Sequence, residues 1–468
     1  MRKKALVTPC SRRNFLRAWI GAPILLSPFR PARAAETGGQ LELSFEASQE
    51  WIDVGGQPAL LYAFNRQVPG PVIEARAGDE VRISFWNRLP ETTNLHFHGL
   101  HIPSSGNADN VMLRVPPGES MEYWFTIPGS HPSGTFWYHP HVHGAAARQV
   151  SRGLAGAIVV RNDADSILEI SRAPEATLVL QDFDIGRNGI PLEPSPMEQM
   201  AGREGSLVTV SGRANPELPI QRDGWLRLRI VNASSSRFYR LGLEDHPLYL
   251  VASDGGLLCA PEMRDEVLLT PGERVEVMVR GNSLPGEYRL LDLPYDRGGM
   301  AMMRMSSLER TAVPLARLRY EGQADSTWDL PAKLASIDPL PAPSVRRTFQ
   351  LGQPMGMMGG AMAFTINGRR FDPNRIDQRA ALNAIEQWEF VNASTMDHPM
   401  HIHTSPFQVI DAAGTPVPTW KDTVLVKARS RLAVRTALST YPGLRMYHCH
   451  ILDHEDLGMM GTLEVSRS

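Results

Sequence analysis

The segment Val81-Arg-Ile-Ser-Phe-Trp-Asn87 alternates apolar with polar residues and ends in an asparagine. Two later segments, Leu226-Arg-Leu-Arg-Ile-Val-Asn232 and Gln387-Trp-Glu-Phe-Val-Asn392, share this pattern. Such alternation is typical of a strand with one buried face. The asparagines stand 145 and 160 residues apart, which is a domain length and too long for a solenoid or propeller repeat. The chain is therefore expected to contain three copies of one β-rich unit.

A second strand pattern recurs later in each unit. The segments Gly134-Thr-Phe-Trp-Tyr-His139, Gly286-Glu-Tyr-Arg-Leu-Leu291 and Gly443-Leu-Arg-Met-Tyr-His448 align without a gap. Glycine (39) and proline (37) are abundant and follow no collagen period, which favours short strands joined by turns. These patterns predict an all-β protein made of three consecutive Greek-key β-sandwich domains.

The repeats also predict where the domains begin and end. We expect them at residues 36–162, 170–310 and 340–468, and a length of 468 residues agrees with about three domains. The stretches 163–215 and 310–345 are rich in proline, alanine and charged residues. We interpret both stretches as connections between domains.

The first 35 residues have the features of an export signal. A basic start is followed by Ser11-Arg-Arg-Asn-Phe-Leu16, which fits the twin-arginine pattern, and by an apolar stretch from Ala18 to Phe29. Ala32-Arg-Ala34 then offers a cleavage site. The apolar stretch is shorter than the about 20 residues that a membrane span needs, and nothing later in the chain is long and apolar enough to span a membrane. We therefore predict a signal peptide over residues 1–35, export by the twin-arginine route, and a periplasmic or extracellular protein without a membrane span.

The charge balance and the cysteine count exclude some classes of protein. The chain has 48 Lys+Arg and 50 Asp+Glu, so no basic field is available to bind nucleic acid. Three cysteines are too few for a disulfide framework. Cys10 lies in the predicted signal, which leaves Cys259, to which we assign no role, and Cys449.

Histidine is concentrated in the first and third units. Twelve of the 14 histidines fall into four short segments there, and four His-x-His pairs stand out: 96/98, 139/141, 401/403 and 448/450. On a strand, residues i and i+2 point the same way, about 7 Å apart, so each pair presents two imidazoles on one face. Neutral imidazole binds copper, zinc, iron and nickel. The middle unit has only His246, and it has Leu291 where the others have His139 and His448. A metal site built by the outer units is the expected result.

One short segment combines a histidine pair with the second mature cysteine. If His448 and His450 face one way on a strand, Cys449 faces the other way, and the strand links two metal centres. His454 and Met459 follow Cys449 at five and ten residues, and His398 precedes the 401/403 pair. Two histidines, a cysteine thiolate and a weak axial methionine form the blue-copper electron-transfer set.

Taken together, these motifs resemble those of three-domain multicopper oxidases of the laccase and copper-efflux oxidase type. The resemblance covers essentially all of the mature chain, and all four histidine segments are present. It implies cupredoxin-like domains and four copper ions: one type 1, one type 2 and two type 3. It also implies electron uptake at the type 1 copper, reduction of O2 to water at a trinuclear cluster, and a middle domain that acts as a copper-free spacer.

The resemblance also implies a role for each ligand. The type 1 copper would take His398, Cys449 and His454 with Met459 axial, the type 2 copper His96 and His401, and the type 3 coppers His98, His139 and His450 in one set and His141, His403 and His448 in the other. His101, His131, His143 and His246 fall outside the pattern, and we expect them to be structural. His454 and His398 are expected to reach the surface, where a reducing substrate would give its electron.

Two acidic residues are candidates for supplying the protons that water formation needs. Glu455 directly follows His454, as the family's acid does, and Asp109 lies in the loop after the first histidine pair. The alternative for each is a solvated loop carboxylate.

Methionine-rich segments bear on the substrate. Met300–Met305 and Met355–Met362 hold eight of the 20 methionines. Thioethers favour Cu(I), so these segments indicate a cuprous-ion substrate, but methionine also fills irregular packing or forms an adaptable mouth for organic substrates. The expected partners are O2 and small reductants, namely phenols, aromatic amines or Cu(I), and we expect a monomer.

Two other functions compete with an oxidase. One is a copper-binding or sequestration protein for copper tolerance, without significant turnover. The other is a structural or cell-envelope protein on the same fold, against which the intact ligand sets argue.

Overall fold

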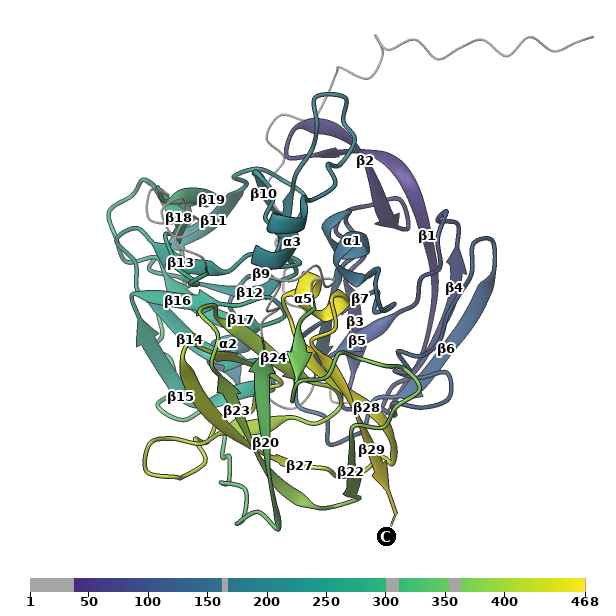
Figure 1. Ribbon diagram of the computed structural model, residues 1–468. Helices are drawn as coiled ribbons and strands as arrows, with labels where there is room; N and C mark the ends of the chain where they lie inside the picture. Colours follow the sequence, from purple (N-terminus) through teal and green to yellow (C-terminus); the bar gives the residue numbers. More distant parts are fainter. Residues whose placement is uncertain (1–37, 162–166, 300–310, 353–362, 468) are drawn as a thin grey trace, which may run out of the picture.

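The computed structural model describes residues 38–161, 167–299, 311–352 and 363–467. Within these ranges the chain forms six β-sheets and four short helices, so the predicted all-β class is confirmed (Figure 1). The helices are α1 (Ala146–Ser151), α2 (Leu168–Ser171), α3 (Pro196–Ala201) and α5 (Leu452–Asp456). None of the helices in these ranges is long and apolar enough to cross a membrane. The predicted signal and both methionine-rich segments lie outside the described residues.

The first unit is a sandwich of two four-stranded sheets. Its strands are β1 (Gln40–Val54), β2 (Gln57–Phe64), β3 (Ile73–Arg76), β4 (Glu80–Asn87), β5 (His96–His98), β6 (Ser120–Thr126), β7 (Gly134–His139) and β8 (Gly156–Arg161). The sheet orders are β2-β1-β4-β6 and β3-β8-β7-β5. Phe45 and Phe85 from one sheet and Tyr138 and Ile158 from the other belong to one buried core. Burial of these faces is the main stabilising contribution.

The middle unit is also a sandwich of two sheets, but they have six and five strands. Its strands are β9 (Glu175–Phe183), β10 (Leu207–Val210), β11 (Glu217–Arg222), β12 (Trp225–Asn232), β13 (Tyr239–Leu243), β14 (Leu248–Ser253), β15 (Gly256–Arg264), β16 (Glu266–Leu269), β17 (Arg274–Arg280), β18 (Glu287–Leu293) and β19 (Val313–Gln323). They form the sheets β10-β9-β12-β17-β14-β15 and β11-β19-β18-β13-β16.

Two parts of the middle unit correct the expected connections. β9 and β10 lie within 163–215, and β19 lies within 310–345, so neither stretch is only a linker. β9 is almost wholly buried beside β12, and β19 buries Leu315 and Leu318 between β11 and β18. The proline and charged residues of these stretches concealed short apolar runs that are long enough for a strand.

The third unit has two five-stranded sheets. Its strands are β20 (Val345–Gly352), β21 (Thr365–Ile366), β22 (Gln378–Ala381), β23 (Ile385–Asn392), β24 (His398–Ile402), β25 (Phe407–Val409), β26 (Thr423–Val426), β27 (Ser430–Ala437), β28 (Gly443–Cys449) and β29 (Met460–Ser466). The sheet orders are β21-β20-β23-β27-β25 and β22-β29-β28-β24-β26.

All three units share one strand topology. β4, β12 and β23 each lie between a parallel neighbour (β1, β9 or β20) and an antiparallel one (β6, β17 or β27). In the second sheet, β7, β18 and β28 occupy equivalent places, and so do β5, β13 and β24. The histidine strands of the outer units therefore have counterparts in the middle unit that carry no histidine.

The repeated asparagines have the same structural role in each unit. Asn87, Asn232 and Asn392 are buried, and their amide groups donate to the carbonyl oxygens of Val115, Leu269 and Val426 at 2.8, 2.9 and 3.0 Å. A buried amide needs such partners, and it fixes the loop that follows the strand. The asparagine therefore has the same role in each unit, which is to fix the turn after its strand.

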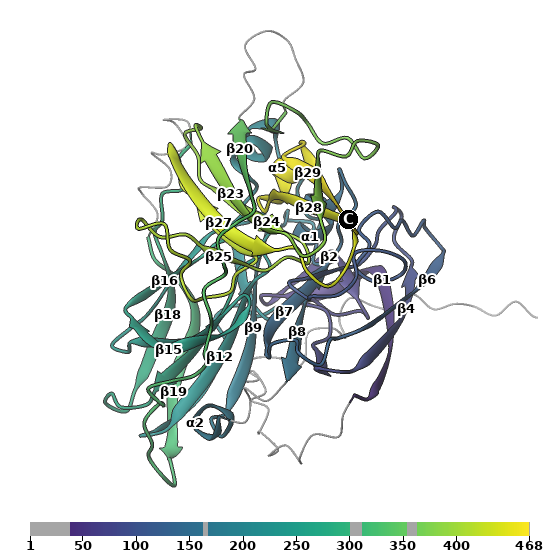
Figure 2. The same ribbon diagram turned by 90° about the horizontal axis from the view of Figure 1, so that it is seen from below.

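The three units meet around the short helices. In Figure 1, α5 lies near the middle of the molecule, close to α1 and α3, and in Figure 2 the green-yellow unit lies above the teal unit at lower left and the purple-blue unit at right. Leu452 of α5 packs on Ala147 and Val150 of α1. Asp453 pairs with Arg203 of the middle unit at 2.7 Å. The third unit is thereby fastened to both of the others beside its histidine segments.

Candidate metal centres

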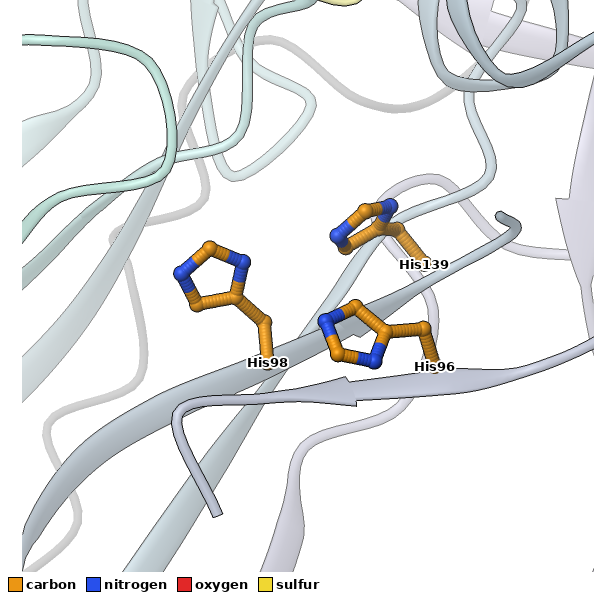
Figure 3. Close-up of side chains that lie close together, drawn as sticks. All are labelled: His96, His98 and His139. Carbon is orange, nitrogen blue, oxygen red and sulfur yellow. The ribbon is translucent and has the colours of Figure 1, made fainter. Parts of the chain in front are cut away.

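Two pairs of strands carry most of the clustered histidines. Across β5 and β7, His96 lies opposite His139, and across β24 and β28, His401 lies opposite His448. Figure 3 shows the imidazoles of His96, His98 and His139 gathered on one side of their strands. The ring centroids of His96 and His98 are 5.6 Å apart, so the i, i+2 spacing does place their rings on one face, and the ring of His139 lies 5.2 Å from that of His96 across the strand pair.

The first and third units bring their histidines together at one buried place. The ring of His98 stacks on His401 with centroids 3.8 Å apart, and His96 stacks on His403 at 4.1 Å. The cluster contains all eight residues of the four pairs: His96, His98, His139, His141, His401, His403, His448 and His450. Each of them is at most 2% exposed.

The nitrogen atoms of this eight-histidine cluster are arranged to hold cations. The Nε2 atoms of His141 and His403 lie 3.2 and 3.1 Å from Nε2 of His448. Burial lowers the pKa of His141 to about 4 and that of His448 to about 3, so both are neutral at pH 7. Five members have buried nitrogens that find no hydrogen-bond partner within the described part of the chain: His96 Nε2, His98 Nδ1, His139 Nε2, His401 Nε2 and both nitrogens of His450. Because buried polar atoms rarely stay unpaired, this donor set fits imidazole-ligated copper ions.

Asp109 is buried against the cluster. Nδ1 of His96 donates to Oδ1 of Asp109 at 2.7 Å, and the amide of Phe97 donates to the same oxygen at 2.9 Å. The second oxygen, Oδ2, has no partner among the described residues. Burial raises the pKa of Asp109 to about 8, although the hydrogen bond from Phe97 opposes the shift. Asp109 is therefore not a solvated loop residue, and it orients His96.

Glu455 approaches the cluster from α5. Its Oε2 lies 3.1 Å from Nδ1 of His448, and its Oε1 lies 3.6 Å from Nδ1 of His141. The side chain is fully buried, and burial raises its pKa against the opposing influence of His141 and His143. Glu455 thus places a carboxyl group that favours its protonated form beside two clustered histidines.

Sequence reasoning missed a third acidic residue beside the cluster, Asp422, which directly precedes β26. Its Oδ1 lies 3.1 Å from Nε2 of His98, and its carbonyl oxygen accepts from Nδ1 of His401 at 2.8 Å. Both of its carboxylate oxygens accept from the guanidinium of Arg274, at 2.8 and 2.6 Å. Burial opposes ionisation, but Arg274 and His98 hold the pKa of Asp422 well below its usual range.

Arg274 corrects the expectation that the middle unit is only a spacer. It begins β17, is fully buried, and also donates from Nε to the carbonyl oxygen of Thr135 in the first unit at 3.2 Å. One side chain of the middle unit therefore joins the other two units beside His98. Nearby, Gly272 lies so close that an added Cβ would stand 2.8 Å from the ring of His450. No signal in a single sequence marks these long-range contacts.

A second centre lies on the other side of β28. Sγ of Cys449 is 3.5 Å from Nδ1 of His398 and 3.7 Å from Nδ1 of His454. The three side chains are completely buried, and burial raises the pKa of the Cys449 thiol. A cation between the two nitrogens would favour the thiolate. This geometry fits a copper ion bound by two imidazoles and one sulfur.

Met459 lies beside this cysteine centre. The amide of Cys449 donates to the carbonyl oxygen of Met459 at 3.0 Å, and the amide of Met459 donates to that of His454 at 2.8 Å. Met459 is fully buried in the same core cluster as Cys449. All four residues expected for a type 1 copper therefore lie in one part of the third unit.

His398 and His454 do not reach the surface, contrary to expectation. Both are 0% exposed. Nε2 of His454 donates to the carbonyl oxygen of Met200, at the end of α3, at 3.1 Å, and Phe364 stacks on the ring with centroids 3.8 Å apart. Nε2 of His398 lies 3.2 Å from Oγ of Ser394. The cover of His454 comes from Met200 of the middle unit and from Phe364, 90 residues earlier in the third unit, so the sequence around the ligand did not indicate it.

The remaining histidines are outside both centres. Nδ1 of His101 donates to the carbonyl oxygen of Thr404, and His246 lies between the carbonyl of Glu244 and the hydroxyl of Tyr320. Nδ1 of His131 donates to its neighbour's carbonyl oxygen. These contacts fit a structural role for His101, His131 and His246, whereas the ring of His143 is exposed and packs edge-on against Phe371.

Comparison with known proteins identifies the family. Three family models, each described as multicopper oxidase, match residues 46–165, 176–322 and 342–468. The cell division protein FtsP of Edwardsiella tarda is 31% identical over 462 residues, covering 95% of this chain and 93% of the relative. The multicopper oxidase mco of Staphylococcus haemolyticus is 29% identical over 415 residues, covering 86% and 83%. The chain belongs to the multicopper oxidase family, whose members are built from cupredoxin-like domains.

A solved structure supports the same assignment. The multicopper oxidase of Campylobacter jejuni, described as a metallo-oxidase, superposes with a TM-score of 0.80 at 31% identity. The match covers 96% of this chain and 99% of that protein. Family membership implies copper as the metal of the two histidine centres.

Proposed function

We propose that the protein is an exported laccase-like oxidase with four copper ions that couples one-electron oxidation of small reductants to reduction of O2 to water. The ligands are those assigned by the family motifs. Cys449, His398, His454 and Met459 would hold the type 1 copper, and the eight-histidine cluster would hold the type 2 copper and the two type 3 coppers.

One observation carries this proposal. Cys449 lies between two histidine nitrogens in one centre, while its chain neighbours His448 and His450 belong to the other. The two centres are therefore joined by adjacent residues of one chain. A storage protein needs only ligands, whereas an oxidase that accepts electrons at one site and uses them at another needs this connection.

The bound copper ions would supply stepwise electron transfer and the binding and four-electron reduction of O2. The residues of the chain do the rest. Asp109 and Asp422 orient His96 and His98 through hydrogen bonds to the nitrogen that faces away from the cluster. The apolar core around Cys449 excludes water from the cysteine centre.

Glu455 and Asp109 are the proposed proton donors. Burial raises the pKa of Asp109 to about 8 and raises that of Glu455 above its usual range. The carboxyl oxygens of Glu455 lie 3.6 and 3.1 Å from the Nδ1 atoms of His141 and His448. Asp109 has one oxygen without a partner among the described residues. Each group is thus placed to deliver protons where water is formed.

Among the expected reductants, the cover of the cysteine centre favours Cu(I) over bulky phenols and aromatic amines. A phenol ring has no exposed histidine edge to stack on, because α3 covers His454. The same helix presents Met197, which is 53% exposed and lies three residues before Met200. Thioethers favour Cu(I), and the Campylobacter jejuni relative is described as a metallo-oxidase.

Oxygen uptake by the copper-loaded protein tests the function and the substrate together. Cu(I), a phenol and Fe(II) should be compared at equal concentration, and we expect Cu(I) to be oxidised fastest. Met197→Leu, which keeps the volume of the side chain, should lower the rate with Cu(I) more than that with the phenol. Equal loss with both substrates would reject methionine as a cuprous ligand, and no oxygen uptake with any reductant would reject the oxidase.

Two alternatives make different predictions. A sequestration protein would bind copper without consuming O2. A structural role in the cell envelope is raised by the relatives named cell division protein FtsP, and it would not require copper at all. The twelve ligand positions filled in this sequence favour the oxidase over both.

Location and assembly complete the proposed function. The twin-arginine signal over residues 1–35 would export the folded chain to the periplasm or beyond, and the N-terminal residue of the mature protein would reveal the cleavage. We propose domains at 36–162, 170–323 and 340–468, the second extended to include β19. We also propose a monomer, which the mass of the protein in solution tests.

A further inference from the structure

Two consecutive methionines, Met459 just before β29 and Met460 at its start, lie on different sides of the sheet. Met459 lies with Cys449, whereas Met460 is paired with His448 in the β28–β29 register. Residues directly opposite one another in an antiparallel pair share a face. Met446 stands two residues before His448 on β28 and shares that face too. Met446 and Met460 therefore flank a histidine of the eight-histidine cluster.

These two methionines line a cavity of about 260 Å³ that ends at the cluster. His141 forms part of its wall, together with His143 and Met112. Met446 and Met460 are 2% and 3% exposed, whereas Met112 is 39% exposed and His143 is exposed as well. Thioether and imidazole groups thus line the cavity from the surface of the molecule to His141 of the cluster.

The chemistry of the cavity wall selects for a soft ion of low charge. Thioether sulfur and imidazole bind Cu(I), and the other wall residues are mainly apolar, including Val111, Leu113 and Phe371. Arg114 also lines the cavity. A guanidinium repels a doubly charged ion twice as strongly as a singly charged one at the same distance. Both features disfavour hydrated Cu(II).

We propose that this cavity is the route by which Cu(I) reaches the eight-histidine cluster. The inference rests on the proposed function, because it takes the cluster as a copper site. The cluster histidines are at most 2% exposed, so an ion needs a passage to them. Met112 and His143 receive Cu(I) at the surface, Met446 and Met460 bind it next, and the imidazoles of His141 and His448 replace the thioethers. Only ligands are exchanged, and no electron or proton is transferred.

Copper uptake by the metal-free full chain tests the route. The protein is mixed anaerobically with Cu(I) supplied as its acetonitrile complex, unbound copper is removed by a chelator at set times, and bound copper is counted. We expect the double variant Met446→Leu/Met460→Leu to fill the cluster about tenfold more slowly than the wild type. Leucine keeps the volume and the apolar character of both positions, so the fold should be retained.

Two controls test whether the slowing belongs to Cu(I) and to this cavity. Met278→Leu changes a fully buried methionine of the middle unit and should load at the wild-type rate. With Cu(II) as the source, the double variant and the wild type should load equally.

Unchanged Cu(I) loading in the double variant would overturn the proposal. So would equal slowing with Cu(I) and Cu(II), or a lower kcat/KM for O2 with normal loading, which would make the cavity a dioxygen path. If the wild type never binds copper at the cluster, the proposed function itself fails.

Discussion

The two histidine centres lie a few residues apart along β28, yet their surroundings differ in kind. Three buried carboxyl groups, Asp109, Asp422 and Glu455, contact the eight-histidine cluster. The cysteine centre is packed among apolar side chains, and its two histidines bond to neutral partners, Ser394 and the carbonyl of Met200.

In the proposed oxidase, this difference would separate proton chemistry from electron chemistry. A centre that makes water needs groups that bind and release protons, and carboxyl groups beside it provide them. A centre that only passes electrons works best when nothing around it changes charge or position. The neutral, tightly packed cysteine centre meets that requirement, and substitutions at each centre should reveal the division.

The largest effect is expected at the cysteine itself. Cys449→Ser removes the sulfur ligand, so the blue absorbance and all substrate oxidation should be lost. The near-ultraviolet band of the type 3 coppers should remain, because His448 and His450 are unchanged. Spectra of the copper-loaded variant check both points, and retained blue absorbance would contradict the type 1 assignment.

Glu455→Gln should impair the eight-histidine cluster and leave electron uptake at the cysteine centre intact, the reverse of Cys449→Ser. The amide keeps the shape but cannot donate a proton, so steady-state O2 reduction should slow between about 100-fold and about 10,000-fold. Anaerobic bleaching of the blue absorbance by a reductant should keep its wild-type rate, since the Glu455 carboxyl group lies against His141 and His448 of the other centre. Slower bleaching would show that the carboxyl group also serves electron uptake.

Asp109 gives a prediction about pH. A proton donor must be protonated, so with a pKa of about 8 its contribution to kcat should be full below that pH and decline above it. Asp109→Asn should lower kcat at neutral pH and remove this decline. The measurement is kcat across the range from mildly acidic to alkaline pH, and a variant that keeps the wild-type profile would assign the titration to another group.

The smallest effect is expected from Ser394→Ala. It removes the neutral hydrogen bond to His398, worth about 1 kcal/mol, and those that the same hydroxyl makes with Asn392 and Met396, but no copper ligand, so copper content and colour should persist. A redox titration of the blue absorbance should show a modest shift in potential. A loss of copper comparable to that of Cys449→Ser would show that the cysteine centre depends on Ser394 for its ligand geometry.

Local patterns in the sequence predicted much of this molecule. The i, i+2 histidine pairs, the alternation across His448-Cys449-His450 and the three asparagine-ended strands depend only on neighbours in the chain, and the structure arranges them as expected. The contacts that sequence reasoning missed all come from distant parts of the chain. Arg274 reaches Asp422 from the middle unit, and α3 covers His454, so the burial of that ligand could not be read from its neighbours.

The separation of these residues along the chain has a consequence for biosynthesis. His98 and Asp422, which meet beside the cluster, are 324 positions apart, and His141 and His448 are 307 apart. A ribosome therefore delivers Asp422 and His448 more than 300 residues after the partners that they meet. Whatever the order of folding, the four clustered histidines of the first unit lack their partners until the third unit has been synthesised.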